Sequence, residues 1–225
     1  MTNEIYGIDY LRRRLADKQT RVLLRYKYYE MKNNAQDFSS LAPEKFKGLK
    51  ETVGWCAKAV DSLADRLQFD EFQNDEFNLS EIFLSNNQDI LIDSAVLSAL
   101  ISACSFVYIR EDNGYPRLQV IDGSNATGII DPVTNLLTEG YAVLERDSMG
   151  VVKTEAYFMA GMTEIYSHGV LVQRIPSSAP YALLVPIIYR PDAKRPFGHS
   201  RISRACIAYT QTALRTIKRS EVSAE

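Results

Sequence analysis

The sequence of 225 residues predicts an α+β protein, with N-terminal helices, a central antiparallel β-meander and a long C-terminal helix. Three observations predict this order. Apolar residues recur at helical spacing through residues 1–104, period-two alternation with turn dipeptides fills residues 105–190, and helical spacing returns over residues 191–225. We therefore expect one region made of a mainly helical part, a sheet of sequential strands and a closing helix.

The first helix is predicted over Tyr10–Met31, with a basic outer face. A second helix follows Pro43, because apolar residues recur from Leu49 to Leu67 at alternating steps of four and three. This seam suits a core-facing helix, with a coiled-coil contact as the alternative. Trp55 lies off the seam and is expected to meet a second surface.

Two further helices are expected before the sheet. The acidic segment 68–78 reads as a short strand and a turn, and Asn78 with Glu81 resembles a capping box that opens a helix through Ser85. The next helix, Gln88–Cys104, is apolar on nearly all sides, which predicts that it is buried.

The strands are predicted from alternation and from turn chemistry. Asn113-Gly114 is the strongest two-residue hairpin signal in the chain, and short polar loops separate the strands that follow. Sequential strands with short loops favour an antiparallel meander, which the pieces PYALLVP and IIYRP close. Two packed sheets and one curved sheet would give the same pattern.

The last helix is expected to begin after Ser200 as its N-cap. No stop signal follows in SEVSAE, so we expect the chain to be cut inside or just after this helix. The residues expected to line its apolar face are Ile202, Cys206, Tyr209, Ala213 and Ile217.

The composition excludes several classes of protein. Apolar residues make up 46% of the chain and charged residues 24%, as in an ordinary globular domain. No run of about 18 apolar residues predicts a membrane span, and the charged N-terminus lacks the apolar core of a secretory signal. Cys56, Cys104 and Cys206 are far apart in apolar stretches, which favours buried thiols in a reducing cytoplasm over a disulfide framework.

Catalytic motifs are missing from the sequence. It contains no nucleophile elbow, phosphate-binding glycine loop or zinc-ligand spacing, so we expect no enzyme activity, no cofactor and no metal. The loop Asp122–Gly128 reads as a turn, with an anion site as the weaker alternative. An enzyme that uses His168 or His199 as its base is the most distant alternative.

Charge is distributed in blocks. Residues 10–32 carry eight basic and two acidic side chains, residues 61–93 nine acidic and one basic, and residues 194–225 seven basic and two acidic. Such blocks suit contacts between subunits or with a polyanion. Asp61 and Asp65 share a helix face beside Arg66, which favours salt bridges over acid–base catalysis. The candidate subunit-contact residues are Arg12, Arg13, Arg14, Asp61 and Asp65.

Three stretches resemble one protein family. RYKYYEMKNN (25–34) resembles the R-Y-Y-E-G opening of siphophage portal proteins. LKETVGWCAKAVDSLADRLQFDEF (49–72) is similar to the portal pattern N-x-x-x-x-V-V-D-x-x-A-x-R-L-x-V-x-G-F. RPFGHSRISRACIAYTQTALRTIKRSEVSAE (195–225) resembles the portal motif P-x-G-x-S-R-I and its long helix. The matching positions are Val60, Asp61, Ala64, Arg66, Leu67, Phe72, Phe197, Gly198, Ser200, Arg201, Ile202 and the tail from Glu221 to Glu225.

The resemblance implies a structural role in a tailed-phage virion. Portal proteins form a homo-oligomeric ring, usually dodecameric, at one vertex of the head, and double-stranded DNA is packaged and ejected through it. Their fold has a wing, a stem, a clip and a crown, and residues 1–225 would hold the wing. The implied partners are terminase, major capsid or scaffolding protein and the head–tail connectors, with assembly in the bacterial host cytoplasm. The regions that line the channel and contact the motor would lie beyond Glu225.

The runner-up is a stand-alone nucleic-acid-binding module that uses the two basic helices. Against it, the net charge of −2 is slightly negative, and the basic residues are not joined to exposed aromatic residues in a groove-like pattern.

Overall fold

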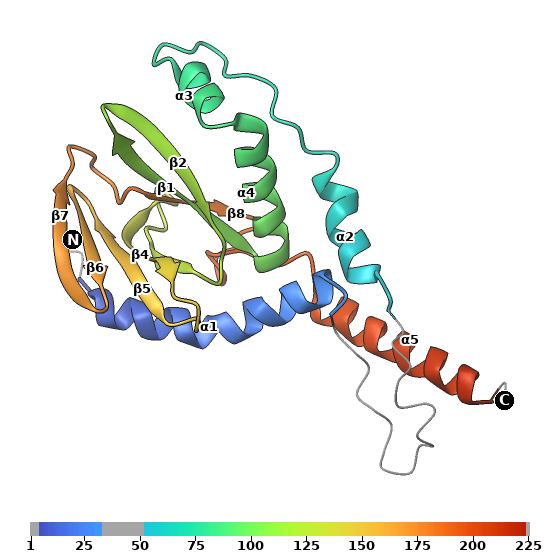
Figure 1. Ribbon diagram of the computed structural model, residues 1–225. Coiled ribbons are helices and arrows are strands. Elements are labelled where there is room, and N and C mark those ends of the chain that lie inside the picture. The colour runs from blue at the N-terminus through green and yellow to red at the C-terminus, as the bar shows by residue number, and fades with distance from the viewer. Residues whose placement is uncertain (1–4, 33–51, 224–225) are drawn as a thin grey trace.

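The computed structural model describes residues 5–32 and 52–223 (Figure 1). It is an α+β protein, with helices in the N-terminal part, antiparallel sheets in the middle and a C-terminal helix. The predicted fold class is therefore confirmed. The helices are α1 (Ile8–Tyr29), α2 (Trp55–Ala64), α3 (Leu79–Ser85), α4 (Gln88–Ser102) and α5 (Arg204–Ser223).

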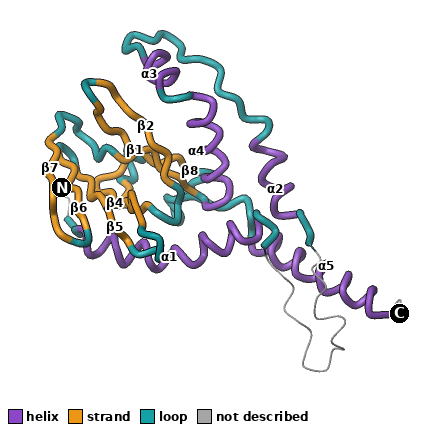
Figure 2. Tube along the Cα trace, in the orientation of Figure 1, coloured by secondary structure: helices purple, strands orange, loops and turns teal. Residues whose placement is uncertain are grey.

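The strands form two sheets rather than one (Figure 2). The five-stranded sheet is a meander in the order β3-β4-β5-β6-β7, and the three-stranded sheet has the order β2-β1-β8. Every pair of neighbouring strands is antiparallel. The strands are β1 (Cys104–Asp112), β2 (Tyr115–Ile121), β3 (Ala126–Ile130), β4 (Leu137–Arg146), β5 (Val152–Met159), β6 (Met162–Ser167), β7 (Val170–Pro176) and β8 (Leu184–Ile188).

The two sheets pack face to face, which decides between the two arrangements left open by the pattern. Phe106 and Tyr108 of β1 share a buried cluster with Ala142 of β4 and Phe158 of β5. The rings of Tyr108 and Phe158 lie 5.0 Å apart, edge to face. α4 covers the other face of the three-stranded sheet, and α1 lies against β3 and β4 (Figure 1).

The last strand does not extend the meander as predicted. PYALLVP and IIYRP supply a single strand, β8, which pairs with β1 instead of β7. The register places Leu184 opposite Tyr108, where Leu184 is fully buried between the sheets. Pairing there also satisfies the second edge of β1, which would otherwise leave backbone groups unpaired in the interior.

Local turn chemistry follows the sequence closely at the first hairpin. Asn113 and Gly114 both have positive φ, 53° and 81°, as a type I′ turn requires. The fourth helix, α4, ends at Ser102, two residues before the predicted end at Cys104. Ala103 adopts a φ of 88°, which ends the helix there.

The predicted strand within residues 68–78 is wrong, because these residues form turns and irregular backbone. Phe69 and Phe72, three residues apart, both pack on Phe83 of α3, which an extended strand with period two does not allow. The predicted capping box is also wrong. Asp75 accepts the backbone N–H groups of Leu79 and Ser80, at 2.6 and 2.7 Å, and so takes the capping role.

Two helix starts also differ from expectation. α2 begins at Trp55. The apolar repeat of the predicted helix begins at Leu49, which lies outside the described residues. α5 begins at Arg204, and Ser203 rather than Ser200 accepts the N–H of Cys206, at 3.1 Å. The hydroxyl of Ser200 is used elsewhere, donating to the carbonyl of Ile101 at 2.6 Å.

The buried face of α5 is rotated from the predicted one. Tyr209 is 68% exposed, whereas Thr210, Leu214 and Lys218 are buried. Ile202 is buried as expected, although it precedes the helix.

Candidate functional site

Arg12 is held within the chain. Its guanidinium donates to Glu155 on β5, with Nε 3.2 Å from Oε2, and a second nitrogen lies 2.7 Å from Oδ1 of Asp9. Glu155 is buried and also accepts the hydroxyl of Tyr141. The hydrogen bond to Glu155 raises the pKa of Arg12, and burial together with Glu155 raises the pKa of Tyr141. Arg12 therefore anchors α1 to the five-stranded sheet.

A second buried carboxylate holds the start of α1. Glu139 on β4 accepts the backbone N–H groups of Tyr6 and Gly7, at 2.8 and 2.9 Å, and the hydroxyl of Tyr157 at 2.6 Å. Gly7 is the N-cap and has no side chain with which to cap the helix. Glu139 therefore supplies the cap from the sheet, and its negative charge suits the positive end of the helix dipole.

The glutamates and tyrosines that make these contacts belong to a repeated tetrapeptide, which the sequence analysis did not identify. Thr-Glu-x-Tyr occurs three times, at 138–141, 154–157 and 163–166, on the neighbouring strands β4, β5 and β6. Period-two alternation puts each Glu and Tyr on one face of the sheet, where Tyr166 also donates to Glu164 at 2.7 Å. We call this set the Glu–Tyr lattice: Glu139, Tyr141, Glu155, Tyr157, Glu164 and Tyr166. The repeat is the signal that would have found it.

The three consecutive arginines do not form one patch. The side chain of Arg13 is exposed, and its Nε lies 3.4 Å from the carbonyl of Asp9. The guanidinium of Arg14 lies over the ring of Phe197, 5.4 Å from its centre. Successive positions on a helix point about 100° apart, so neighbouring residues in sequence face different surroundings.

The two predicted acidic contact residues also differ in environment. Asp61 is half-buried and accepts the hydroxyl of Tyr29 at 2.9 Å. Burial and this carboxylate raise the pKa of Tyr29 to about 12. Asp65 is exposed at the end of α2. The chain does not bring the basic and acidic sets together, since the start of α1 and α2 lie at opposite ends of the molecule (Figure 1).

A cluster of cations lies along α1 and in the loop before α5. Arg14, Lys18, Arg21 and Arg25 recur at steps of four, three and four, and Arg195 reaches the same region from the loop before α5. Nζ of Lys18 lies 5.3 Å from the ring centre of Phe106 and 5.8 Å from that of Phe197. Burial, followed by the nearby arginines, lowers the pKa values of Lys18 and Arg25. We call these five side chains the cationic cleft.

The histidines do not share a site. His168 lies in the turn between β6 and β7, with a φ of 49°. His199 lies in the loop before α5, where it pairs with Asp192 at 2.5 Å and lies 3.3 Å from a guanidinium nitrogen of Arg195. Both partners of His199 therefore belong to the same loop, between β8 and α5. Of the loop predicted at Asp122–Gly128, residues 122–125 form the turn, and β3 begins at Ala126.

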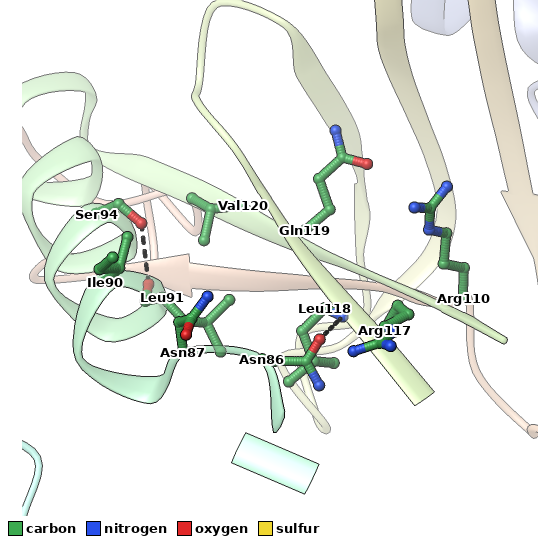
Figure 3. Close-up of a pocket in the computed structure, with 10 residues that line it drawn as sticks. All are labelled: Asn86, Asn87, Ile90, Leu91, Ser94, Arg110, Arg117, Leu118, Gln119 and Val120. Carbon is green, nitrogen blue, oxygen red and sulfur yellow. Dashed lines mark hydrogen bonds between the residues drawn. The ribbon is translucent and has the colours of Figure 1, made fainter. Parts of the chain in front are cut away.

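An open groove of about 400 Å³ lies between α4 and the β1–β2 hairpin (Figure 3). Its polar groups are partly used inside the chain. Asn86 accepts the N–H of Leu118 at 2.9 Å, and Arg117 donates to the carbonyl of Ser85 at 3.1 Å. Arg110 and Arg117 are direct cross-strand partners in this groove. The groove holds no nucleophile paired with a base.

No protein-family model and no curated protein matches the sequence. Residues 5–32 and 52–223 contain no group of three or more His, Cys, Asp or Glu side chains placed to hold a metal ion. Within those residues, no helix has the length and apolar character needed to cross a bilayer.

Proposed function

We propose that the chain is a non-catalytic structural subunit of a tailed-phage portal ring and forms the wing of that subunit. In this role it would assemble with copies of itself at one vertex of the phage head, after synthesis in the host cytoplasm. Double-stranded DNA, terminase, capsid or scaffolding protein and head–tail connectors would be its partners. The proposal rests on the resemblance described above and on how the three resembling stretches pack.

One observation carries the proposal. The three stretches are far apart in sequence, yet they meet in one apolar cluster where α1, α2, α4 and α5 join. The members from the three stretches are Tyr26, Tyr28 and Tyr29, then Cys56, Val60, Leu63 and Ala64, and finally Ile202, Cys206 and Ile207.

Polar contacts join the same stretches. Asp61, a position that matches the portal pattern, accepts from Tyr29 of the first stretch at 2.9 Å. Arg201, which matches in the third stretch, donates from Nε to the carbonyl of Ala59 in the second stretch at 2.9 Å. Residues that serve one shared core are expected to occur together in a family, so the combined match is worth more than three separate ones.

The surface also suits assembly. Arg13 on α1 and Asp65 at the end of α2 are both exposed and lie on different elements, as two different surfaces of a head-to-tail ring contact would be. α5 projects from the body and packs mainly on α2, and Tyr209 on it is 68% exposed (Figure 1). An exposed aromatic residue on a projecting helix suits burial by a partner.

A charge exchange in the whole gene product tests this proposal. Arg13→Glu and Asp65→Arg should each reduce ring formation in a salt-dependent way, and the double variant should restore it. Electron micrographs and sedimentation measure the rings. Ring formation that neither single variant changes would remove the proposed contact. Arg12 is left unchanged, because its reversal would place a negative charge against buried Glu155.

A further inference from the structure

The cationic cleft has an arrangement that the subunit contact does not explain. The four members on α1 lie within 12 residues at helical spacing, and 11 steps of 1.5 Å make one row about 16 Å long. Three of its members face the molecule, since Arg14 and Lys18 lie over Phe197 and Arg25 donates to the carbonyl of Ser102 at 2.8 Å, whereas Arg21 is exposed. Arg14, Lys18 and Arg25 are each half-buried and Arg21 and Arg195 are exposed, so each of the five side chains is at least partly accessible from solvent.

The charges in the cleft are not balanced by the described part of the chain. Among residues 5–32 and 52–223, none of the five cations has a carboxylate within salt-bridge distance. Asp122 is the carboxylate that acts on Lys18, and its oxygens already accept from the N–H of Ser124 at 2.6 Å and from Asn125 at 2.8 Å. When Asp17 on the same helix and Asp192 in the loop of Arg195 are counted with Asp122, five positive charges stand against three negative ones, so a net positive charge remains. Like charges at this spacing repel one another unless an anion joins them.

The form of the cleft indicates the class of anion. Guanidinium groups present several N–H donors in a plane and bind phosphate oxygens in pairs, and Lys18 adds a point charge at the centre. A phosphate group, with up to two negative charges and oxygens in several directions, can meet donors from α1 and from the loop of Arg195 together. A single carboxylate neutralises only one of the surplus charges.

We infer that the cationic cleft, formed by Arg14, Lys18, Arg21, Arg25 and Arg195, is a binding site for a phosphate group, either free or in a nucleic-acid backbone. Lys18 is the central residue, because its Nζ lies over both aromatic rings and its neighbours in the set are on either side of it along α1. The inference is independent of the proposed ring function, since it concerns one face of a single subunit.

Isothermal titration of the chain at low ionic strength tests the site. Inorganic phosphate should bind to the wild type, and Lys18→Met and Arg195→Gln should each weaken binding by about tenfold, as loss of one charge-assisted contact does. Arg195 is exposed in a loop, so its replacement should leave the fold intact. Arg13→Gln, on the same helix outside the cleft, is the matched control and should stay within about twofold.

A short DNA duplex distinguishes the two sources of phosphate. If the ligand is a backbone phosphate, the duplex binds more tightly than inorganic phosphate, loses affinity steeply with salt and is displaced by phosphate. If the ligand is free phosphate, the duplex does not compete. No binding of either probe would overturn the inference. So would an equal loss in Arg13→Gln and Lys18→Met, which would show that only general charge attraction is measured.

Discussion

The two sides of α1 carry the same residue type in opposite situations. On the side of the five-stranded sheet, Arg12 meets Glu155 within the Glu–Tyr lattice, where buried carboxylates accept from tyrosines and from the helix. On the other side, Arg14 and Lys18 lie over aromatic rings with no described carboxylate at salt-bridge distance. Arg12 and Arg14 are two positions apart, yet one closes a structural bond and the other leaves charge available. Charge that is paired stabilises the fold, whereas charge that is unpaired is open to a ligand.

The largest effect is expected on the paired side. Arg12→Met leaves the buried Glu155 without its cation, and we expect the free energy of unfolding to fall by about 2–4 kcal/mol. Urea denaturation followed by circular dichroism measures it. Arg13→Met is the control and should change stability by less than about 0.5 kcal/mol, since Arg13 is exposed. Equal effects at the two positions would mean that the lattice does not depend on this pair.

The next effect concerns the start of the same helix. Glu139→Gln keeps the shape but removes the charge that caps α1, and we expect a loss of about 1–2 kcal/mol. Amide exchange at Tyr6 and Gly7, whose N–H groups Glu139 accepts, should become faster than in the wild type. Glu164→Gln is the matched comparison at the third repeat, where no helix end is capped. Unchanged exchange in Glu139→Gln would exclude the cap.

The sequence predicted the helices, the first hairpin and the meander because period and turn chemistry are local properties. It could not predict that β8 joins β1, because that pairing depends on which edge is left open after the sheets pack. The Thr-Glu-x-Tyr repeat that forms the Glu–Tyr lattice is present in the sequence. Its role in holding α1 could not be predicted, because that role depends on α1 lying across the strands. Two of the candidate contact residues, Arg12 and Asp61, bind side chains of the same chain. Their partners, Glu155 and Tyr29, are distant in sequence, so the sequence alone did not indicate these bonds.

On the unpaired side, removal of a charge should help the free protein. Lys18→Met should raise stability at neutral pH, because burial, Arg14 and Arg21 disfavour the charged lysine more than Cys104 and Asp122 favour it. The pKa of Lys18 is lower in the folded than in the unfolded chain. The penalty is therefore complete below the folded pKa and is relieved as pH rises toward 10.5, the ordinary value.

Paired denaturation curves at several pH values measure this difference. The advantage of Lys18→Met over the wild type should shrink steadily as pH approaches 10.5. A variant that is less stable than the wild type at neutral pH would show that Lys18 already has an anionic partner in the free chain.

The smallest effect is chemical and lies in the shared apolar cluster. Burial and the nearby thiol of Cys56, 3.3 Å away, raise the pKa of Cys206 to about 11. At pH 7.5 its thiolate fraction is then below roughly one in a thousand, so alkylation should be at least about tenfold slower than for a free thiol. Mass spectrometry after timed exposure to iodoacetamide measures the rate. Reaction at the rate of an unhindered thiol would show that α2 and α5 separate readily.

The measurement that tests the proposed function most directly is the mass of the whole gene product in solution. Native mass spectrometry counts the subunits in the particle. The account predicts one discrete closed oligomer of many subunits, seen in electron micrographs as a ring with a central channel. A protein that stays monomeric at every protein and salt concentration would contradict the ring proposal. The proposed phosphate site of the cationic cleft is tested separately, by the titration with phosphate.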